Sequence, residues 1–171
     1  LATRLEDAPQ NNRLRWLLDP RRSGLALVMS AIGCHAQHLA CFVAGRNVAR
    51  VAADVGMLVP GRKVVDHVSA LLEFESGVSG LLATVRATPF YWRVHAFGTL
   101  GNAEVLGETE LVLRMSGQPP ERRTLAPADS LRAELEAFAD AVQGLAPFPV
   151  TPAQMLDTVA AFESVVEALR A

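Results

Sequence analysis

The rest of the chain is organised around the stretch Ala31–Gly45, which reads AIGCHAQHLACFVAG. A turn of small residues ends at Gly33 and precedes a predicted helix, which should end at Gly45 because glycine readily adopts the left-handed conformation of a helix C-terminus. His35 lies in the first turn of this helix and His38 one turn later, so the two imidazoles occupy neighbouring positions on one helical face. No other stretch combines a glycine turn, a helix start and side chains that titrate near neutral pH.

The same helix is predicted to bury an apolar stripe made of Leu39, Phe42 and Val43. Cys34 and Cys41 are the two cysteines of the chain, and both lie on this helix. At 1.5 Å per residue they are about 10 Å apart along the helix axis, too far to form a disulfide within it. Two thiols without a wider framework are typical of a reducing compartment.

The chain of 171 residues is long enough for one domain with a substantial core, so we predict a single domain over residues 1–171. A hydrophobic fraction of 50% with 20% charged residues is typical of a globular protein in water. The formal net charge of -2 provides no basic field for a phosphate backbone, which argues against nucleic acid as a partner.

Membrane insertion is not expected either, because no apolar run approaches the roughly 20 residues needed to span a bilayer. The first residues carry charges and lack the apolar core of a signal peptide. We therefore expect a cytoplasmic protein.

The middle of the chain changes from a helical period to the alternation of strands. Turn signals such as Pro60-Gly61, Ser76-Gly77 and Pro119-Pro120 separate the segments. Short connections join antiparallel neighbours, so we expect a meander that forms most of one sheet. The predicted strands are residues 47–58, 64–75, 78–87, 91–99, 102–106, 110–115 and 121–125.

Alternation also indicates which face of the sheet is buried. In the second strand, Val68, Ala70, Leu72 and Phe74 share one wholly apolar face, whereas the other face is mixed. Helical spacing predicts two closing helices, 130–144 and one that begins at Thr151-Pro152, with an apolar stripe in the latter formed by Met155, Val159, Phe162, Val166 and Leu169. The predicted fold is α+β, a predominantly antiparallel open sheet with helices packed on one face and the other face a candidate oligomer interface.

Two chemical roles are open for the histidines. With a reference pKa of about 6.5, His35 can act as a general acid or base, although a histidine at a helix start can also be purely structural. His38 adds the alternative of a two-histidine metal site, but no carboxylate stands nearby in sequence and we assign no metal. Near the N-terminus, Trp16 beside Arg15 either caps a core or lines a pocket for a polar ligand.

The chain carries no dinucleotide-binding fingerprint of its own. No Gly-x-Gly-x-x-Gly follows a predicted strand, and Gly98-Thr99-Leu100-Gly101 lies between two strands with no helix behind it. We therefore assign no cofactor-binding residue in this chain.

Taken in order, these pieces resemble the C-terminal domain of the Gfo/Idh/MocA oxidoreductases. The resemblance covers nearly the whole chain after about Arg15, and it rests on the spacing of several motifs rather than on any single one. The motifs are GCHAQH at 33–38, FESGVSG at 74–80, WRVHAFGTLGNAE at 92–104, LEAFADAV at 135–142 and the helix opened by Thr151.

The resemblance implies the second half of an NAD(P)-dependent dehydrogenase that acts on a hydroxyl or carbonyl carbon of a sugar, cyclitol or related small molecule. In this family a Rossmann domain with the glycine fingerprint and a catalytic lysine precedes the α+β domain, which supplies a histidine, supports the substrate and makes the oligomer contacts. We expect that Rossmann domain to be absent from this chain and the chain alone to be inactive and to bind no cofactor. Carried over by position, His35 is the catalytic residue, and the substrate-binding residues are His38, Trp16, Arg15 and Gly33.

Two positions depart from the family pattern. Relatives often carry an aspartate four residues before the histidine and another three residues after it, where this chain has Ala31 and His38. Losing both carboxylates removes groups that would orient or tune His35. The alternative function is therefore a non-catalytic module for subunit assembly, with a vestigial site at His35.

Overall fold

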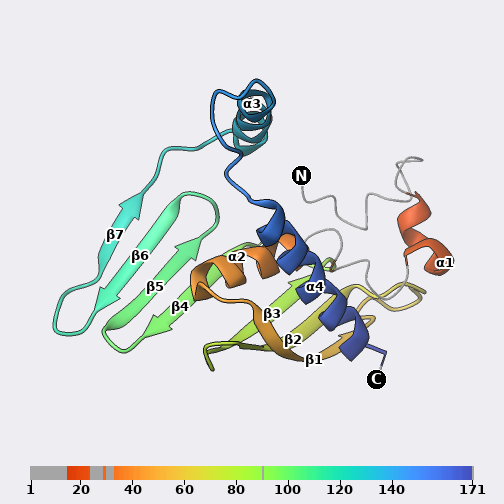
Figure 1. Ribbon diagram of the computed structural model, residues 1–171. Coiled ribbons are helices and arrows are strands. Elements are labelled where there is room, and N and C mark those ends of the chain that lie inside the picture. The colour runs from red at the N-terminus through yellow and green to blue at the C-terminus, as the bar shows by residue number, and fades with distance from the viewer. Residues whose placement is uncertain (1–14, 24–28, 30–32, 90, 171) are drawn as a thin grey trace. The chain divides into compact units, whose positions relative to one another are not determined.

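The computed structural model describes residues 15–23, 29, 33–89 and 91–170. The chain divides into two compact units, one formed by Leu1–Pro89 with Pro152–Ala171 and the other by Phe90–Thr151 (Figure 1). Each unit has its own antiparallel sheet. The expectation of one domain over residues 1–171 stays a prediction.

The first unit is a three-stranded antiparallel sheet with two helices over one face. The strand order is β1-β2-β3, and the central strand places Leu72 opposite Val51 on one side and opposite Gly80 on the other. Helix α4 contacts β1, and α2 contacts both α4 and β3. The elements are α2 (Cys34–Ala44), β1 (Val48–Gly56), β2 (His67–Phe74), β3 (Ser79–Val85) and α4 (Pro152–Ala168) (Figure 1).

The core of this unit follows the alternation of β2, as predicted. Val68, Ala70, Leu72 and Phe74 are 0–4% exposed, and Met29, Leu82 and Val165 complete the buried cluster. On the opposite face, Leu71 is 50% exposed and its cross-strand neighbour Leu81 is 89% exposed. The sheet therefore has one apolar face covered by helices and one mixed face on which Leu71 and Leu81 are exposed.

The apolar stripe predicted for α2 is wrong. Phe42 and Val43 are 72% and 50% exposed, whereas Gln37 is fully buried. The side chains of Ala36, Ala40, Cys41 and Ala44 pack against the core. Small side chains on the inner face let a helix lie close to its neighbours, and this close approach decides which face is buried.

The stripe predicted for α4 is correct only in part. Phe162 and Leu169 pack against the core, but Met155 and Val159 are 44% and 53% exposed. The buried residues of this helix are Ala161 and Val165, which again include a small side chain on the inner face.

Residues 15–23 are more regular than their polar composition indicates. They contain a 3₁₀ turn, η2 (Arg15–Leu18), and a single helical turn, α1 (Pro20–Ser23). Asp19 stabilises the start of α1, because its carboxylate accepts a hydrogen bond from the Arg21 N–H at 3.0 Å. Proline at the first helical position needs no hydrogen-bond donor, so Asp19-Pro20 begins a helical turn here.

The second unit is a four-stranded meander, β4-β5-β6-β7, followed by a helix. The antiparallel meander is confirmed, but the described strands form two sheets rather than mostly one. Residues between β3 and β4 include Pro89, which has no N–H to donate to a ladder. The elements are β4 (Arg93–Gly98), β5 (Gly101–Leu106), β6 (Glu110–Met115), β7 (Glu121–Thr124) and α3 (Ser130–Val142) (Figure 1).

Helix α3 begins where the sequence predicts. The Asp129 carboxylate accepts a hydrogen bond from the Arg132 N–H at 3.0 Å, which is the usual N-cap arrangement. Its apolar residues Leu131, Leu135 and Phe138 are each more than half exposed. None of the helices among the described residues combines the length and the apolar character needed to cross a membrane.

Candidate functional site

The candidate site is built on the first turns of α2. Gly33 is the N-cap of this helix, and a Cβ atom added there would lie 2.4 Å from the sulfur of Met29, which is fully buried. Glycine is therefore needed at position 33 because the backbone lies close to the Met29 side chain, not because the backbone has an unusual conformation. At the other end Gly45 has a φ of 63°, the left-handed conformation predicted for the helix end.

His35 occupies the first turn of α2 and is exposed to solvent. No described residue makes a hydrogen bond or ion pair with its imidazole. An exposed imidazole at a helix start can donate a proton to a bound molecule or accept one from it.

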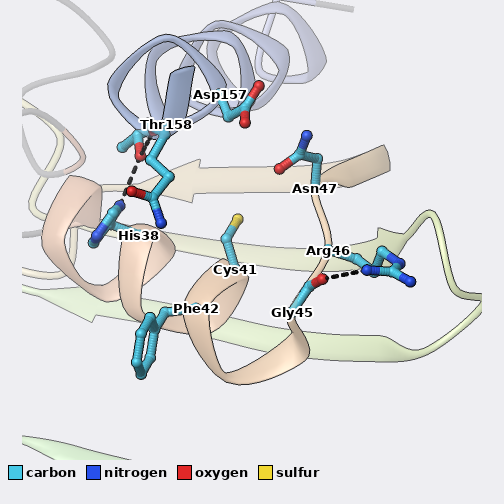
Figure 2. Close-up of a pocket in the computed structure, with 9 residues that line it drawn as sticks. His38, Cys41, Phe42, Gly45, Arg46, Asn47, Asp157 and Thr158 are labelled. Atoms are coloured by element: carbon cyan, nitrogen blue, oxygen red, sulfur yellow. Dashed lines mark hydrogen bonds between the residues drawn. The ribbon is translucent and has the colours of Figure 1, made fainter. Parts of the chain in front are cut away.

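His38 has different surroundings, because it is bonded to the second helix. Its Nδ1 lies 2.8 Å from the hydroxyl oxygen of Thr158 in α4 (Figure 2). The Thr158 hydroxyl donates its one hydrogen to the Gln154 carbonyl oxygen, also at 2.8 Å, so it must accept from Nδ1. When His38 is neutral, Nδ1 therefore carries the proton and Nε2 is the acceptor.

Gln37 makes a second bond to the same residue of α4. Its side-chain amide donates to the Thr158 carbonyl oxygen at 3.2 Å. The Gln37 side chain is fully buried, and its Oε1 has no hydrogen-bond partner among the described residues. Two consecutive residues of α2 are thus bonded to one residue of α4.

A pocket of about 330 Å³ opens between the two helices beyond His38 (Figure 2). Besides His38 and Thr158, its walls include Cys41, Asn47 and Asp157. His35 is not one of the residues that line it. The two histidines of the sequence motif therefore face different surroundings.

The thiol in this pocket is poorly suited to nucleophilic chemistry. Burial raises the pKa of Cys41, and the negative charge of Asp157 raises that pKa further. A thiol with a raised pKa is protonated at neutral pH, and the protonated form is neither a nucleophile nor a metal ligand. Within the described ranges, no group of three or more His, Cys, Asp or Glu side chains is arranged to hold a metal ion.

The other predicted site residues lie outside this pocket. Trp16 is 47% exposed in η2, and its carbonyl oxygen accepts a hydrogen bond from the Ser23 hydroxyl at 3.2 Å. The side chain of Arg15 and the whole of Ala31 lie outside the described residues. Gln37 and Thr158 were not predicted as site residues. The one local sign of them in the sequence is the polar amide of Gln37 between the two histidines.

A second polar cluster lies in the four-stranded sheet and was not predicted. The carboxylate of Glu104, which is 4% exposed, pairs with Arg93 from β4 and with Arg114 from β6, the latter at 2.8 Å. The hydrogen bond from Arg114 is the main cause that lowers the pKa of Glu104, and the charge of Arg93 lowers it further. This network connects three adjacent strands.

Comparison with known families identifies the class of domain. Residues 2–104 match the model of the GFO/IDH/MocA C-terminal domain. The match covers more than half of the chain, which therefore belongs to this family. No curated protein sequence matches the chain significantly.

Solved structures agree on the fold. UDP-N-acetylglucosamine 3-dehydrogenase from Acidithiobacillus ferrooxidans is 24% identical, with a TM-score of 0.74 over 83% of this chain and 47% of its own. An aldose-aldose oxidoreductase from Caulobacter crescentus, complexed with glycerol, is 19% identical, with a TM-score of 0.76 over 91% and 48%. An oxidoreductase from Agrobacterium radiobacter in complex with NAD+, L-tartaric acid and magnesium is 19% identical, with a TM-score of 0.73 over 86% and 48%.

At these identities the likeness is one of fold. The chain spans about half the length of each of these three solved structures.

Proposed function

We propose that this chain is the substrate-binding and oligomerisation domain of a longer, cytoplasmic NAD(P)-dependent oxidoreductase. The substrate is a sugar, cyclitol or similar small molecule that reacts at a hydroxyl or carbonyl carbon. Family membership supports this proposal, as do the names of two structural neighbours, a nucleotide-sugar dehydrogenase and an aldose oxidoreductase. The neighbours are about twice as long as this chain, which leaves room for a separate Rossmann domain.

The observation that carries the proposal is the position of His35. It stands exposed in the first turn of α2, two residues after a glycine that packs on buried Met29. In the proposed reaction His35 removes the hydroxyl proton of the substrate during oxidation and returns it during reduction. NAD(P), bound by the longer protein, supplies the hydride acceptor or donor.

This chain does not fit a dinucleotide by itself. Gly98 and Gly101 have the spacing of part of the fingerprint, but these residues pair across the hairpin between β4 and β5. A dinucleotide site needs a strand followed by a helix whose N-terminus faces the pyrophosphate. The cofactor residues of the proposed enzyme therefore belong to its other domain.

Substrate contacts are proposed for His38, Trp16, Arg15 and Gly33. For His38 the bond from Nδ1 to Thr158 leaves Nε2 as an acceptor for a substrate hydroxyl. The half-exposed indole of Trp16 offers an apolar surface to a sugar ring. Gly33 contributes by allowing α2 to start close to the core.

Replacing His35 by alanine in the full-length protein tests the proposal. A general acid or base contributes about 100-fold or more to the rate, so kcat should fall by at least that factor with KM little changed. The matched control is His95→Ala, a histidine of β4 that has no proposed role in the reaction. Steady-state kinetics with NAD(P) and the physiological substrate measure both constants.

A second candidate function is a non-catalytic module for subunit assembly, in which the site at His35 is vestigial. The exposed leucines on the open face of the β1-β2-β3 sheet favour it, because such a face is a candidate protein interface. If His35→Ala leaves turnover on the true substrate unchanged, the catalytic proposal is wrong and only the assembly role remains.

A further inference from the structure

Among the described residues, none holds the side chain of His35 directly. The N-cap of α2 is a glycine, so no side chain caps the first turn, and no described residue bonds to the exposed imidazole. Proton transfer nevertheless requires the ring to stand within hydrogen-bond reach of the substrate hydroxyl, and a misplacement of about 1 Å can cost 100-fold in rate. Among the described residues, the contacts that can set the position of His35 are therefore those of the next turn of α2.

The next turn is held by Thr158 of α4. Gln37 donates to its carbonyl oxygen at 3.2 Å, and His38 donates to its hydroxyl oxygen at 2.8 Å. Consecutive residues of an α-helix project about 100° apart, so two bonds from Gln37 and His38 to one residue restrict rotation of α2 about its axis as well as its distance from α4. His35 lies two residues before Gln37 and three before His38, so a rotation of α2 would move His35 around the same axis.

The surroundings of Gln37 indicate that its hydrogen bond to Thr158 positions α2 rather than stabilising the fold. The side chain is fully buried and leaves its Oε1 without a partner among the described residues. An unpaired buried acceptor costs free energy, and a leucine would fill a similar volume without that cost. Among the described residues the buried amide makes one hydrogen bond, and that bond reaches Thr158.

We propose that Thr158 is a positioning residue for proton transfer: bonded to Gln37 and His38, it fixes the rotation of α2 and so the place of His35. This inference rests on the proposed function of His35. It also gives a role to His38, the second histidine of the motif, that does not require contact with the substrate.

The test uses four variants of the full-length protein. Thr158→Val keeps the shape of the side chain and removes the hydroxyl, and Thr158→Ser restores the hydroxyl. Gln37→Leu removes the other bond without leaving a cavity. The matched control is Ser164→Ala, because the Ser164 hydroxyl makes the same bond to the carbonyl oxygen four residues earlier in α4, at 3.0 Å to Ala160.

We expect kcat to fall about tenfold in Thr158→Val and in Gln37→Leu, with KM changed by less than twofold, because the lost positioning acts in the transition state. Thr158→Ser and Ser164→Ala should stay within twofold of the parent protein. The melting temperature of Gln37→Leu should equal or exceed that of the parent, which a purely structural role does not predict. The ¹⁵N chemical shifts of the His38 ring should report a proton on Nδ1 in the parent and a change in Thr158→Val.

The outcomes separate this inference from the proposed function. If His35→Ala abolishes turnover but Thr158→Val and Gln37→Leu keep kcat within twofold, the positioning role is wrong and the catalytic role of His35 stands. If kcat and the melting temperature fall together in Thr158→Val and in Gln37→Leu, the positioning role is also wrong, because loss of stability then explains the loss of activity. If His35→Ala leaves turnover unchanged, the positioning role falls together with the proposed function.

Discussion

Two neighbouring residues at the start of α2 have opposite environments. Gly33 is buried against the side chain of Met29, whereas His35 is exposed to solvent. A helix whose N-cap residue packs on the core and whose side chain two residues later faces solvent can hold a polar group on a rigid support. The precision of the proposed site thus depends on the glycine as much as on the histidine.

Replacing Gly33 by alanine should lower the free energy of unfolding by about 1–3 kcal/mol, the usual cost of overpacking a core. The new Cβ would lie 2.4 Å from the sulfur of the buried Met29 side chain, so that side chain must shift within the core to accommodate it. Gly98→Ala is the matched control, since its Cβ would find the nearest atom at an ordinary 3.6 Å. Urea denaturation followed by circular dichroism measures both, and equal stability of the two variants would contradict the packing role.

The sequence predicted which residues could act but not which would be bonded together. A histidine at a helix start is visible in the pattern around Gly33, and the helix does begin at Cys34. The bonds from Gln37 and His38 to Thr158 join residues 121 and 120 positions apart in the chain. They depend on how two helices pack, and neither helix carries a local signal for its partner.

At the scale of elements, strands were easier to predict than buried helical faces. Strand alternation with turns at glycine and proline located all seven described strands, and β6 has the predicted bounds Glu110–Met115. The same reasoning failed for α2, where Phe42 is exposed and Gln37 is buried. A helix has several possible inner faces, and close packing through Ala36 and Ala40 outweighed the larger apolar side chains.

The ion-pair network of Glu104 makes the four-stranded sheet sensitive to acid. Its pKa in the folded state lies below the ordinary value of 4.5, so the carboxylate stabilises the folded state above pH 4.5 and this contribution is lost as the pH falls through the lowered pKa. Hydrogen exchange of the β4–β6 amides at pH 7 and at low pH should show reduced protection on the acid side. In Glu104→Gln the protection at pH 7 should already be reduced, with less further loss on acidification.

The control for this prediction is Glu108→Gln, an exposed acid in the turn between β5 and β6. It should leave the protection of the strands unchanged at both pH values. If Glu104→Gln and the parent lose protection equally on acidification, the network does not account for the acid sensitivity.

At the scale of the whole molecule, the open face of the three-stranded sheet is the surface to explain. Leu81 is 89% exposed and stands opposite Leu71, which in turn stands opposite Ala52. The cross-strand row formed by these three residues is flanked by the ion pair of Arg50 with Glu73. An apolar centre with a charged edge is typical of a protein interface, which supports the proposed homo-oligomer.

Replacing Leu81 by glutamate should therefore shift the full-length protein toward a smaller assembly. Burying a leucine side chain is worth about 1.5–3 kcal/mol in each subunit, and a buried unpaired carboxylate costs more than that. The matched control is Leu156→Glu, because Leu156 is 70% exposed on α4 rather than on the open face of the sheet. Sedimentation velocity over a range of concentrations measures the assembly, and an unchanged distribution for Leu81→Glu would exclude this face as the interface. If Leu156→Glu alone dissociates the protein, the subunits meet through the helical face, where α2 and α4 would then be shared between assembly and the proposed chemistry.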